Sequence, residues 1–142
     1  MFVDSWAWIA LADRSDAGHQ IAKETYQQHF KSCKPFVTTD YVLSEVITYL
    51  YQTLPTMQAE AFIEAIMQGI EQGTYLFHHV NELEFRRAWE WRLKYDDKPD
   101  ISFVDLTSMV IMQELKIVDV FTGDYHFSQV NLGFSLHPER TS

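Results

Sequence analysis

Short apolar segments alternate along this chain with longer segments in which apolar residues recur every three or four positions. The short segments are typical of buried strands, and the longer spacing is typical of amphipathic helices. Strands separated by helices pair through crossover connections, which favour a parallel sheet with helices on both faces. The alternation therefore predicts a three-layer α/β/α domain whose mostly parallel central sheet has about four to five short strands.

Residues that begin or end helices separate these segments. Ser5, Asn81 and Ser102 can each cap the N-terminus of a helix, and Thr39 or Asp40 can cap another. The expected strands cover 1–4, 36–38, 75–80, 117–121 and 134–136, and the expected helices cover 5–12, 17–31, 40–50, 56–73, 81–95, 102–115 and 125–130. The sequence has no internal repeat and no stretch that resembles a linker, so we expect a single domain over residues 1–142.

The number of cysteines and the length of the apolar segments argue against a disulfide-bonded, secreted or membrane-spanning protein. The one cysteine, Cys33, excludes an internal disulfide and a zinc site built from several cysteines, and a reducing, cytoplasmic setting is the default expectation. The N-terminal segment has no basic region, and Asp4 and Asp13 interrupt its apolar stretch, so we expect no signal peptide. No window reaches the roughly 18 apolar residues of a membrane span, so we expect no membrane partner.

The charge balance at first disfavours nucleic acid as a partner. The chain has 20 Asp and Glu residues against 11 Lys and Arg residues, which gives a formal net charge of −9. Proteins that bind nucleic-acid phosphates usually carry a basic patch. The positions of the acidic residues change this interpretation.

Four acidic residues lie at or near the expected ends of strands. Asp4 ends the first expected strand, Asp124 follows the fourth, and Asp105 opens the sixth expected helix. Glu45 lies less than two turns into the helix after the second expected strand. Ligands of open α/β sheets bind outside the carboxyl ends of the strands, so we expect these carboxylates to converge. Their mutual repulsion is relieved by hard divalent cations, and oxygen ligands select Mg²⁺ or Mn²⁺ over zinc.

Each of the aspartates also has a purely structural interpretation. Asp4 can cap the first helix, and Asp124 can cap the helix after it. Asp105 completes an acidic variant of the capping box with Ser102 and can satisfy backbone amides in the first turn. The sequence leaves both interpretations open for these three residues.

Glu45 is more difficult to explain as a structural residue. Its helix looks apolar on nearly every side, and its neighbours there are Val42, Leu43, Val46, Ile47 and Tyr49. Such a helix is normally buried, and a buried glutamate needs a partner or a metal. No Lys or Arg lies within several residues of it, which favours a functional acid over an ion pair with a more distant part of the chain.

Taken together and in order, four segments resemble the PIN-domain nucleases, and most closely the single-domain VapC-like toxins of toxin–antitoxin pairs. The segments are Val3-Asp4-Ser5, Thr38-Thr39-Asp40-Tyr41-Val42-Leu43-Ser44-Glu45, Ser102-Phe103-Val104-Asp105 and Phe121-Thr122-Gly123-Asp124-Tyr125-His126-Phe127. The resemblance extends over nearly the whole chain. The sequence departs from the family pattern in a first strand with only three residues before Asp4, and in Leu106, where a small residue is more usual.

The resemblance implies an acidic quartet that holds one or two Mg²⁺ or Mn²⁺ ions. It implies that Asp4 and Asp105 are the most direct ligands, that Glu45 and Asp124 act partly through water, and that Thr122 supports the site. The implied chemistry is hydrolysis of RNA phosphodiester bonds by a water that the metal activates, because no His or Lys is obviously placed to act as the base.

Other polar residues are weaker candidates. Asp100 can assist the metal from the rim of the same loop, although a solvated loop acid is the more usual role. Arg87 and Lys94 can contact RNA phosphates, although they also fit an ordinary polar helix face opposite Phe85, Trp89 and Leu93. His126 can contact RNA, although a surface histidine is the simpler interpretation.

The leading hypothesis is a metal-dependent endoribonuclease that is the toxin of a toxin–antitoxin pair. By resemblance, we expect an RNA substrate such as tRNA, a cognate antitoxin protein and a homodimer. The alternatives are a catalytically silent PIN-fold binding module and a housekeeping PIN nuclease of RNA processing. A haloacid-dehalogenase-type phosphohydrolase is disfavoured, because the first strand ends in Asp4-Ser5-Trp6 and not in Asp-x-Asp. Since part of the negative charge lies in the metal site, we expect RNA binding to depend on metal.

Overall fold

The structure, a computed structural model, describes residues 1–139. Within these residues, five strands form one sheet, and seven helices connect and cover them. The strands are β1 (Phe2–Val3), β2 (Phe36–Thr39), β3 (Tyr75–His78), β4 (Asp119–Phe121) and β5 (Ser135–His137). The helices are α1 (Ser5–Ala12), α2 (His19–Lys31), α3 (Asp40–Thr53), α4 (Thr56–Glu71), α5 (Glu82–Lys94), α6 (Phe103–Glu114) and α7 (His126–Gln129).

The sheet has the order β3-β2-β1-β4-β5, and every pairing between neighbouring strands is parallel. From β1 the chain builds outward through β2 to β3 on one side, and it then returns to build β4 and β5 on the other side. The strand order therefore reverses direction between the neighbouring strands β1 and β4, which makes this pair the topological switch point of the sheet. A crevice forms outside the carboxyl ends of strands at such a switch point, which is the usual ligand site of an open α/β sheet.

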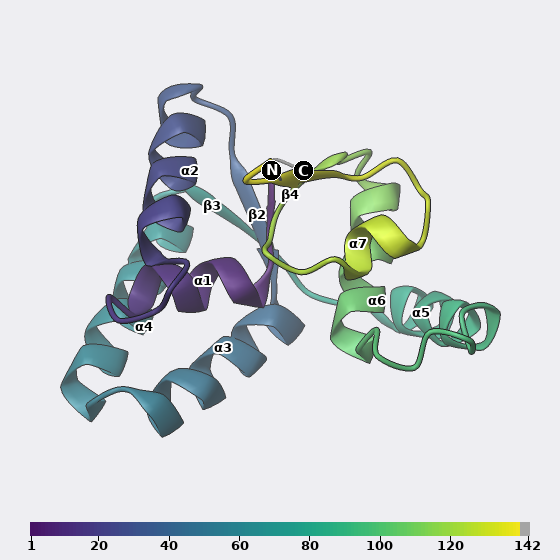
Figure 1. The fold of residues 1–142 in the computed structure, drawn as a ribbon, viewed down its shortest axis with the longest axis horizontal. Coiled ribbons are helices and arrows are strands. Elements are labelled where there is room, and N and C mark those ends of the chain that lie inside the picture. Colours follow the sequence, from purple (N-terminus) through teal and green to yellow (C-terminus); the bar gives the residue numbers. More distant parts are fainter. Residues whose placement is uncertain (140–142) are drawn as a thin grey trace.

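Helices lie on both sides of the sheet, as a three-layer fold requires. Figure 1 shows α1, α2 and α4 to the left of the strands and α5, α6 and α7 to the right, with α3 near the end of β2. Contacts between α1 and α2, and between α5 and α6, hold each layer together. The predicted α/β/α architecture with a parallel sheet of short strands is confirmed.

The hydrophobic core fixes β1, β4 and α6, the three elements that position the central aspartates. The strand residues Phe2, Val3, Val120 and Phe121 are almost fully buried. In α6, all side chains from Asp105 to Met112 are buried, which makes α6 a rigid support.

The predicted helix boundaries agree with the structure at several caps. The Thr39 side chain accepts a hydrogen bond from the Val42 amide, and Asn81 forms a full capping box with Glu84. After α4, Gly73 has a φ of 79°, the left-handed conformation that ends helices.

Ser5 was predicted to cap the first helix, and this prediction is wrong. The N-cap position belongs to Asp4, whose side chain makes no capping hydrogen bond, and Ser5 is the first helical residue. The Ser5 hydroxyl is instead used in a contact with Glu45 from α3.

The exposed surface of α5 includes large apolar side chains. Phe85, Trp89 and Leu93, which the sequence places opposite the basic stripe, are all exposed, and the buried residues of α5 are Glu84 and Ala88. The burial of Glu84 is stabilised by a hydrogen bond to His78 at 2.8 Å and by the capping box. Periodicity predicted which residues share a face of α5 but not which face is covered.

Among residues 1–139, no helix combines the length and the apolar character that a membrane crossing requires.

Candidate active site

Two of the acids lie directly at the switch point of the sheet. Asp4 follows β1, and its backbone amide donates to the carbonyl of Phe121 at the end of β4. Asp124 follows β4 by three residues. The parallel pairing of β1 with β4 thus brings the two aspartates to the same edge of the sheet.

All four predicted acids line one pocket of about 480 Å³. Asp105 reaches the pocket from the first turn of α6, and Glu45 reaches it from α3. His126, from α7, completes the set of ionisable groups in the pocket lining. The convergence that was expected from the strand ends is therefore present in the structure.

Asp4 is the most deeply buried of these acids, with 3% of its surface exposed. Its Oδ2 accepts a hydrogen bond from the Thr122 hydroxyl at 2.8 Å, whereas its buried Oδ1 has no hydrogen-bond partner among the described residues. Burial, together with the charge of Asp105, raises the pKa of Asp4 to about 7. A buried carboxylate oxygen without a donor is unfavourable unless a cation binds there.

Thr122 fixes the relative positions of the two switch-point aspartates. Its hydroxyl donates to Asp4 and accepts from the backbone amide of Asp124 at 3.0 Å. This contact is consistent with the supporting role that was predicted for Thr122.

Asp105 uses its backbone, and not its carboxylate, for capping. Its amide donates to the Ser102 hydroxyl at 3.0 Å, while its Oδ2 lies 2.9 Å from Nδ1 of His126. Burial raises the pKa of Asp105, and the charge of Asp124 adds to this effect, whereas the contact with His126 opposes it. The Asp105 carboxylate therefore faces the pocket and does not cap the helix. The side chain that caps α6 is that of Ser102.

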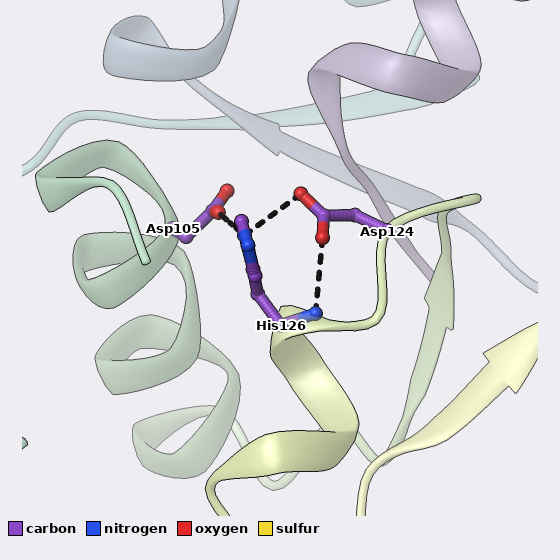
Figure 2. A group of neighbouring side chains, drawn as sticks. All are labelled: Asp105, Asp124 and His126. Carbon is purple, nitrogen blue, oxygen red and sulfur yellow. Dashed lines mark hydrogen bonds and ion pairs between the residues drawn. The ribbon is translucent and has the colours of Figure 1, made fainter. Parts of the chain in front are cut away.

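Asp124 combines both interpretations that the sequence left open. Its Oδ1 accepts a hydrogen bond at 3.0 Å from the amide of His126, the first residue of α7, although the N-cap position belongs to Tyr125. Its Oδ2 lies 2.9 Å from Nδ1 of His126. Figure 2 shows the imidazole between the carboxylates of Asp105 and Asp124.

The surroundings of Glu45 differ from the prediction of a buried side chain. Glu45 is exposed, because the buried face of α3 is formed by Val42, Leu43, Val46 and Leu50, and Glu45 lies on the side that faces the pocket. Its Oε1 accepts a hydrogen bond from the Ser5 hydroxyl at 2.7 Å. The predicted convergence with the other acids is present, but the burial argument that supported it was wrong.

Three weaker candidates lie outside this lining. Asp100 is exposed and does not line the pocket. Arg87 pairs with Glu114 at 3.0 Å, and Glu114 ends α6, whereas Asp105 lies in the first turn of that helix. The Lys94 ammonium lies over the Tyr95 ring, 5.4 Å from its centroid. The structure brings none of these three side chains to the acidic pocket.

Sequence reasoning missed how central two residues are. Ser5 orients Glu45, and His126 contacts two of the acids. The only available signal was their position, because Ser5 directly follows Asp4 and His126 follows Asp124 by two residues.

The donor set of the pocket fits a divalent metal. Three buried or half-buried carboxylates and one exposed carboxylate converge there, and the Oδ1 of Asp4 lacks a donor. Asp105, Asp124 and His126 each offer a ligand atom, and these atoms lie within 4.8 Å of one another. Carboxylate clusters of this kind suit Mg²⁺ and Mn²⁺.

Comparison with known proteins identifies the family. The sequence profile of the PIN domain matches residues 1–132. The chain belongs to the PIN-domain family. It is 32% identical over 130 residues to "23S rRNA-specific endonuclease VapC20" of Mycobacterium tuberculosis, in both strain CDC 1551 / Oshkosh and strain H37Rv, which covers 90% of this chain and 92% of the relative.

The PIN fold is also similar to a solved structure. The crystal structure of Mycobacterium tuberculosis VapC20, described as a sarcin-ricin loop cleaving toxin, superposes with a TM-score of 0.77 at 31% identity. The match covers 94% of this chain and 95% of the VapC20 chain. The predicted resemblance to VapC-like toxins, the fold class and the assignment as a ribonuclease are confirmed by these findings.

Proposed function

We propose that this PIN-domain protein is a divalent-metal-dependent endoribonuclease that uses Asp4, Glu45, Asp105 and Asp124 and acts as the toxin of a toxin–antitoxin pair. The observation that carries the proposal is the unpartnered Oδ1 of Asp4 in a pocket lined by three further carboxylates. Without a cation, four carboxylates in one pocket repel each other. Burial first, and the charges of neighbouring carboxylates in addition, raise the pKa values of Asp4 and Asp105. A bound Mg²⁺ or Mn²⁺ relieves both costs.

Each side chain has a distinct task in this proposal. Asp4 and Asp105 are the direct ligands, since both are buried and held by neighbours, and Glu45 and Asp124 contribute partly through water. Thr122 positions Asp4 and Ser5 positions Glu45. When bound, one or two metal ions supply an activated water and neutralise charge on the transferring phosphoryl group. The residues of this chain orient the metal and the scissile phosphate, and Asp100 stays a weaker supporting candidate.

A second pocket offers a path for the RNA chain. This pocket, of about 540 Å³, is lined by residues that include Tyr41, Tyr49 and Val104, and it shares Glu45 with the acidic pocket. Tyr49 is 43% exposed. Aromatic rings of this kind stack on unpaired bases, so a single-stranded or looped RNA can lie beside the carboxylates. We therefore propose that an unpaired base of the RNA stacks on Tyr41 or Tyr49 and that the scissile phosphate next to this base lies at the carboxylates.

The relatives favour ribosomal RNA over tRNA as the substrate. The similar protein is named as specific for 23S rRNA, and its structure is described as that of a toxin that cleaves the sarcin-ricin loop. We extend this substrate class to the present chain as a proposal. The tRNA expectation, and the RNA contacts predicted for Arg87, Lys94 and His126, stay predictions.

The net charge of −9 is consistent with a protein that acts on RNA only after metal loading. A basic antitoxin segment is a natural partner for the acidic pocket, because it places positive charge where the metal would lie. We propose a cognate antitoxin, a homodimer and a cytoplasmic location, in line with the VapC type.

The test of this function is cleavage of defined RNAs by the purified protein. We expect cuts in 23S rRNA in the presence of Mn²⁺ or Mg²⁺, no cuts in the presence of a chelator, and slower or absent cleavage of tRNA. Cleavage of tRNA in preference to ribosomal RNA would retain the nuclease and reject the substrate proposal. Absence of cleavage of any RNA by a metal-loaded, folded protein would favour the silent binding module.

A further inference from the structure

The imidazole of His126 lies at the centre of the acidic pocket. Its Nδ1 is 2.9 Å from Oδ2 of Asp105 and 2.9 Å from Oδ2 of Asp124, which come from α6 and from the loop after β4 (Figure 2). The contact with Asp105 has hydrogen-bond geometry, and the contact with Asp124 is an ion pair. One ring nitrogen therefore faces two carboxylate oxygens at equal distances.

A proton on Nδ1 makes a well-aligned hydrogen bond to only one of the two oxygens. The ring nitrogen carries at most one hydrogen, which points along one direction in the ring plane, and the contact with hydrogen-bond geometry is the one to Asp105. Oδ2 of Asp124 lies off that line, 2.9 Å from Nδ1, in an ion pair. A cation beside all three atoms satisfies both contacts.

The distances agree with the edges of a coordination polyhedron. Neighbouring ligand atoms of an octahedral ion with bonds of roughly 2.1 Å lie roughly 3.0 Å apart. The two separations from Nδ1 are 2.9 Å, and the candidate ligand atoms of Asp105, Asp124 and His126 all lie within 4.8 Å of one another. Nδ1 is therefore at the spacing of a neighbouring ligand from each of the two carboxylate oxygens.

A second observation points to a cation at the same place. Asp4, which lines this pocket and is 3% exposed, has a buried Oδ1 with no hydrogen-bond partner among the described residues. This oxygen is independent of the contacts of His126 and provides a further oxygen donor.

We propose that His126 is itself a metal ligand through Nδ1, so that the ion is held by an imidazole nitrogen beside the carboxylates of Asp105 and Asp124. The inference rests on the proposed metal-dependent function and goes beyond it, because the acidic quartet alone contains only oxygen ligands.

A nitrogen ligand changes which ion the site prefers. Mg²⁺ is a hard cation that binds oxygen and keeps several waters, whereas first-row transition ions accept imidazole readily. The site therefore prefers Mn²⁺ over Mg²⁺, and replacing His126 by a residue without a ring nitrogen reduces that preference. We expect the His126→Gln substitution to weaken Mn²⁺ binding at least about tenfold and to change Mg²⁺ binding much less.

The direct test is pulsed electron paramagnetic resonance of the purified protein loaded with Mn²⁺. We expect electron spin echo modulation from a directly bound ¹⁴N nucleus in the wild type, and its replacement by a ¹⁵N pattern when the histidines are labelled with ¹⁵N. The His126→Gln variant is expected to lose the nitrogen signal. The matched control, His79→Gln, changes an exposed histidine that does not line the pocket and is expected to keep it.

The outcomes separate this inference from the proposed function. Bound Mn²⁺ without a nitrogen signal in the wild type, or with a signal that survives His126→Gln, overturns the ligand role of His126 and leaves the carboxylate site intact. If the variant does not fold, the labelled wild type still reports histidine ligation, and among residues 1–139 His126 is the one histidine in the lining of the acidic pocket. No Mn²⁺ binding by the wild type in calorimetry overturns both the ligand role and the proposed metal site.

Discussion

Asp4 shows how a single residue can be unfavourable for the fold and still belong to the proposed metal site. Thr122 satisfies one oxygen of its carboxylate, and the other oxygen is buried with no donor among the described residues. Burial and the nearby charge of Asp105 together raise its pKa to about 7. At neutral pH without metal, the folded state therefore contains a carboxylate that ionises less readily than in the unfolded chain.

The sign of the resulting pH dependence follows from this raised pKa. Well below the ordinary pKa of 3.8, Asp4 is protonated in both the folded and the unfolded state, and its burial has no electrostatic cost. Between pH 4 and 7 the unfolded chain loses this proton first, so the metal-free protein loses stability as the pH rises. We expect Asp4→Asn to raise the free energy of unfolding in chelator by on the order of 3 kcal/mol at pH 8 and by much less at pH 4.

Thermal unfolding of both proteins in chelator, measured from pH 4 to 8, checks this prediction. The Asn side chain can still accept the Thr122 hydrogen bond, so the comparison isolates the charge. A variant that is less stable than the wild type at pH 8, or a difference that does not change with pH, would be incompatible with the raised pKa.

At the scale of elements, the connection from β4 to α7 depends on a glycine. A Cβ added at Gly123 would lie 2.6 Å from Nε1 and 2.7 Å from Cζ2 of Trp6, which is closer than real Cβ contacts. Gly123, Trp6 and Asp124 all line the acidic pocket. The close approach of the loop to α1 therefore sets the position of Asp124.

The Gly123→Ala substitution tests this element. The added methyl group must displace the Trp6 ring or the loop that carries Asp124, and we expect a loss of stability of about 1–3 kcal/mol and a fall in RNA cleavage of at least tenfold. The control is Gly73→Ala at the end of α4, where a Cβ meets no atom within 4 Å but φ is 79°. We expect the control to lose about 1 kcal/mol of stability and to keep its cleavage rate. Equal rates for the two variants would show that Gly123 does not position Asp124.

The elements also show what the sequence could and could not predict. Strands and caps were predictable because apolar runs, Asn81 and Ser102 carry local signals. The exposed sides of α3 and α5 were not, because periodicity groups residues on a helix face without saying which face packs on the sheet. Glu45 was therefore expected to be buried and is exposed, and Trp89 is exposed as well.

The candidate site was predictable to the extent that it depends on strand ends. The carboxyl ends of parallel strands meet at one edge, so Asp4 and Asp124 were expected to be close. His126 was not identified as central, because its partner Asp105 lies 21 residues away in sequence. No spacing rule relates the first residue of α7 to the first turn of α6.

At the scale of the whole molecule, the site exists only because the chain reverses its direction of building at β1. Thr122 and Asp4 are separated by 118 residues in sequence and joined by a hydrogen bond of 2.8 Å. The sheet order β3-β2-β1-β4-β5 places the last acid beside the first. Part of the net charge of −9 is thus concentrated at one edge of the sheet, which explains how an acidic protein can act on RNA once it holds a metal.

The central claim is that this edge is a metal-dependent site for RNA cleavage, and the most direct measurement is single-turnover cleavage of 23S rRNA in Mn²⁺ by wild type, Asp105→Asn and Asp96→Asn. Asp96 is an exposed loop residue outside the pocket lining and receives the same chemical change. Losing a direct ligand costs several kcal/mol of transition-state stabilisation, so we predict a rate reduced by roughly a thousandfold or more for Asp105→Asn and an unchanged rate for Asp96→Asn, with both variants folded. Cleavage by folded Asp105→Asn at the wild-type rate would contradict the account.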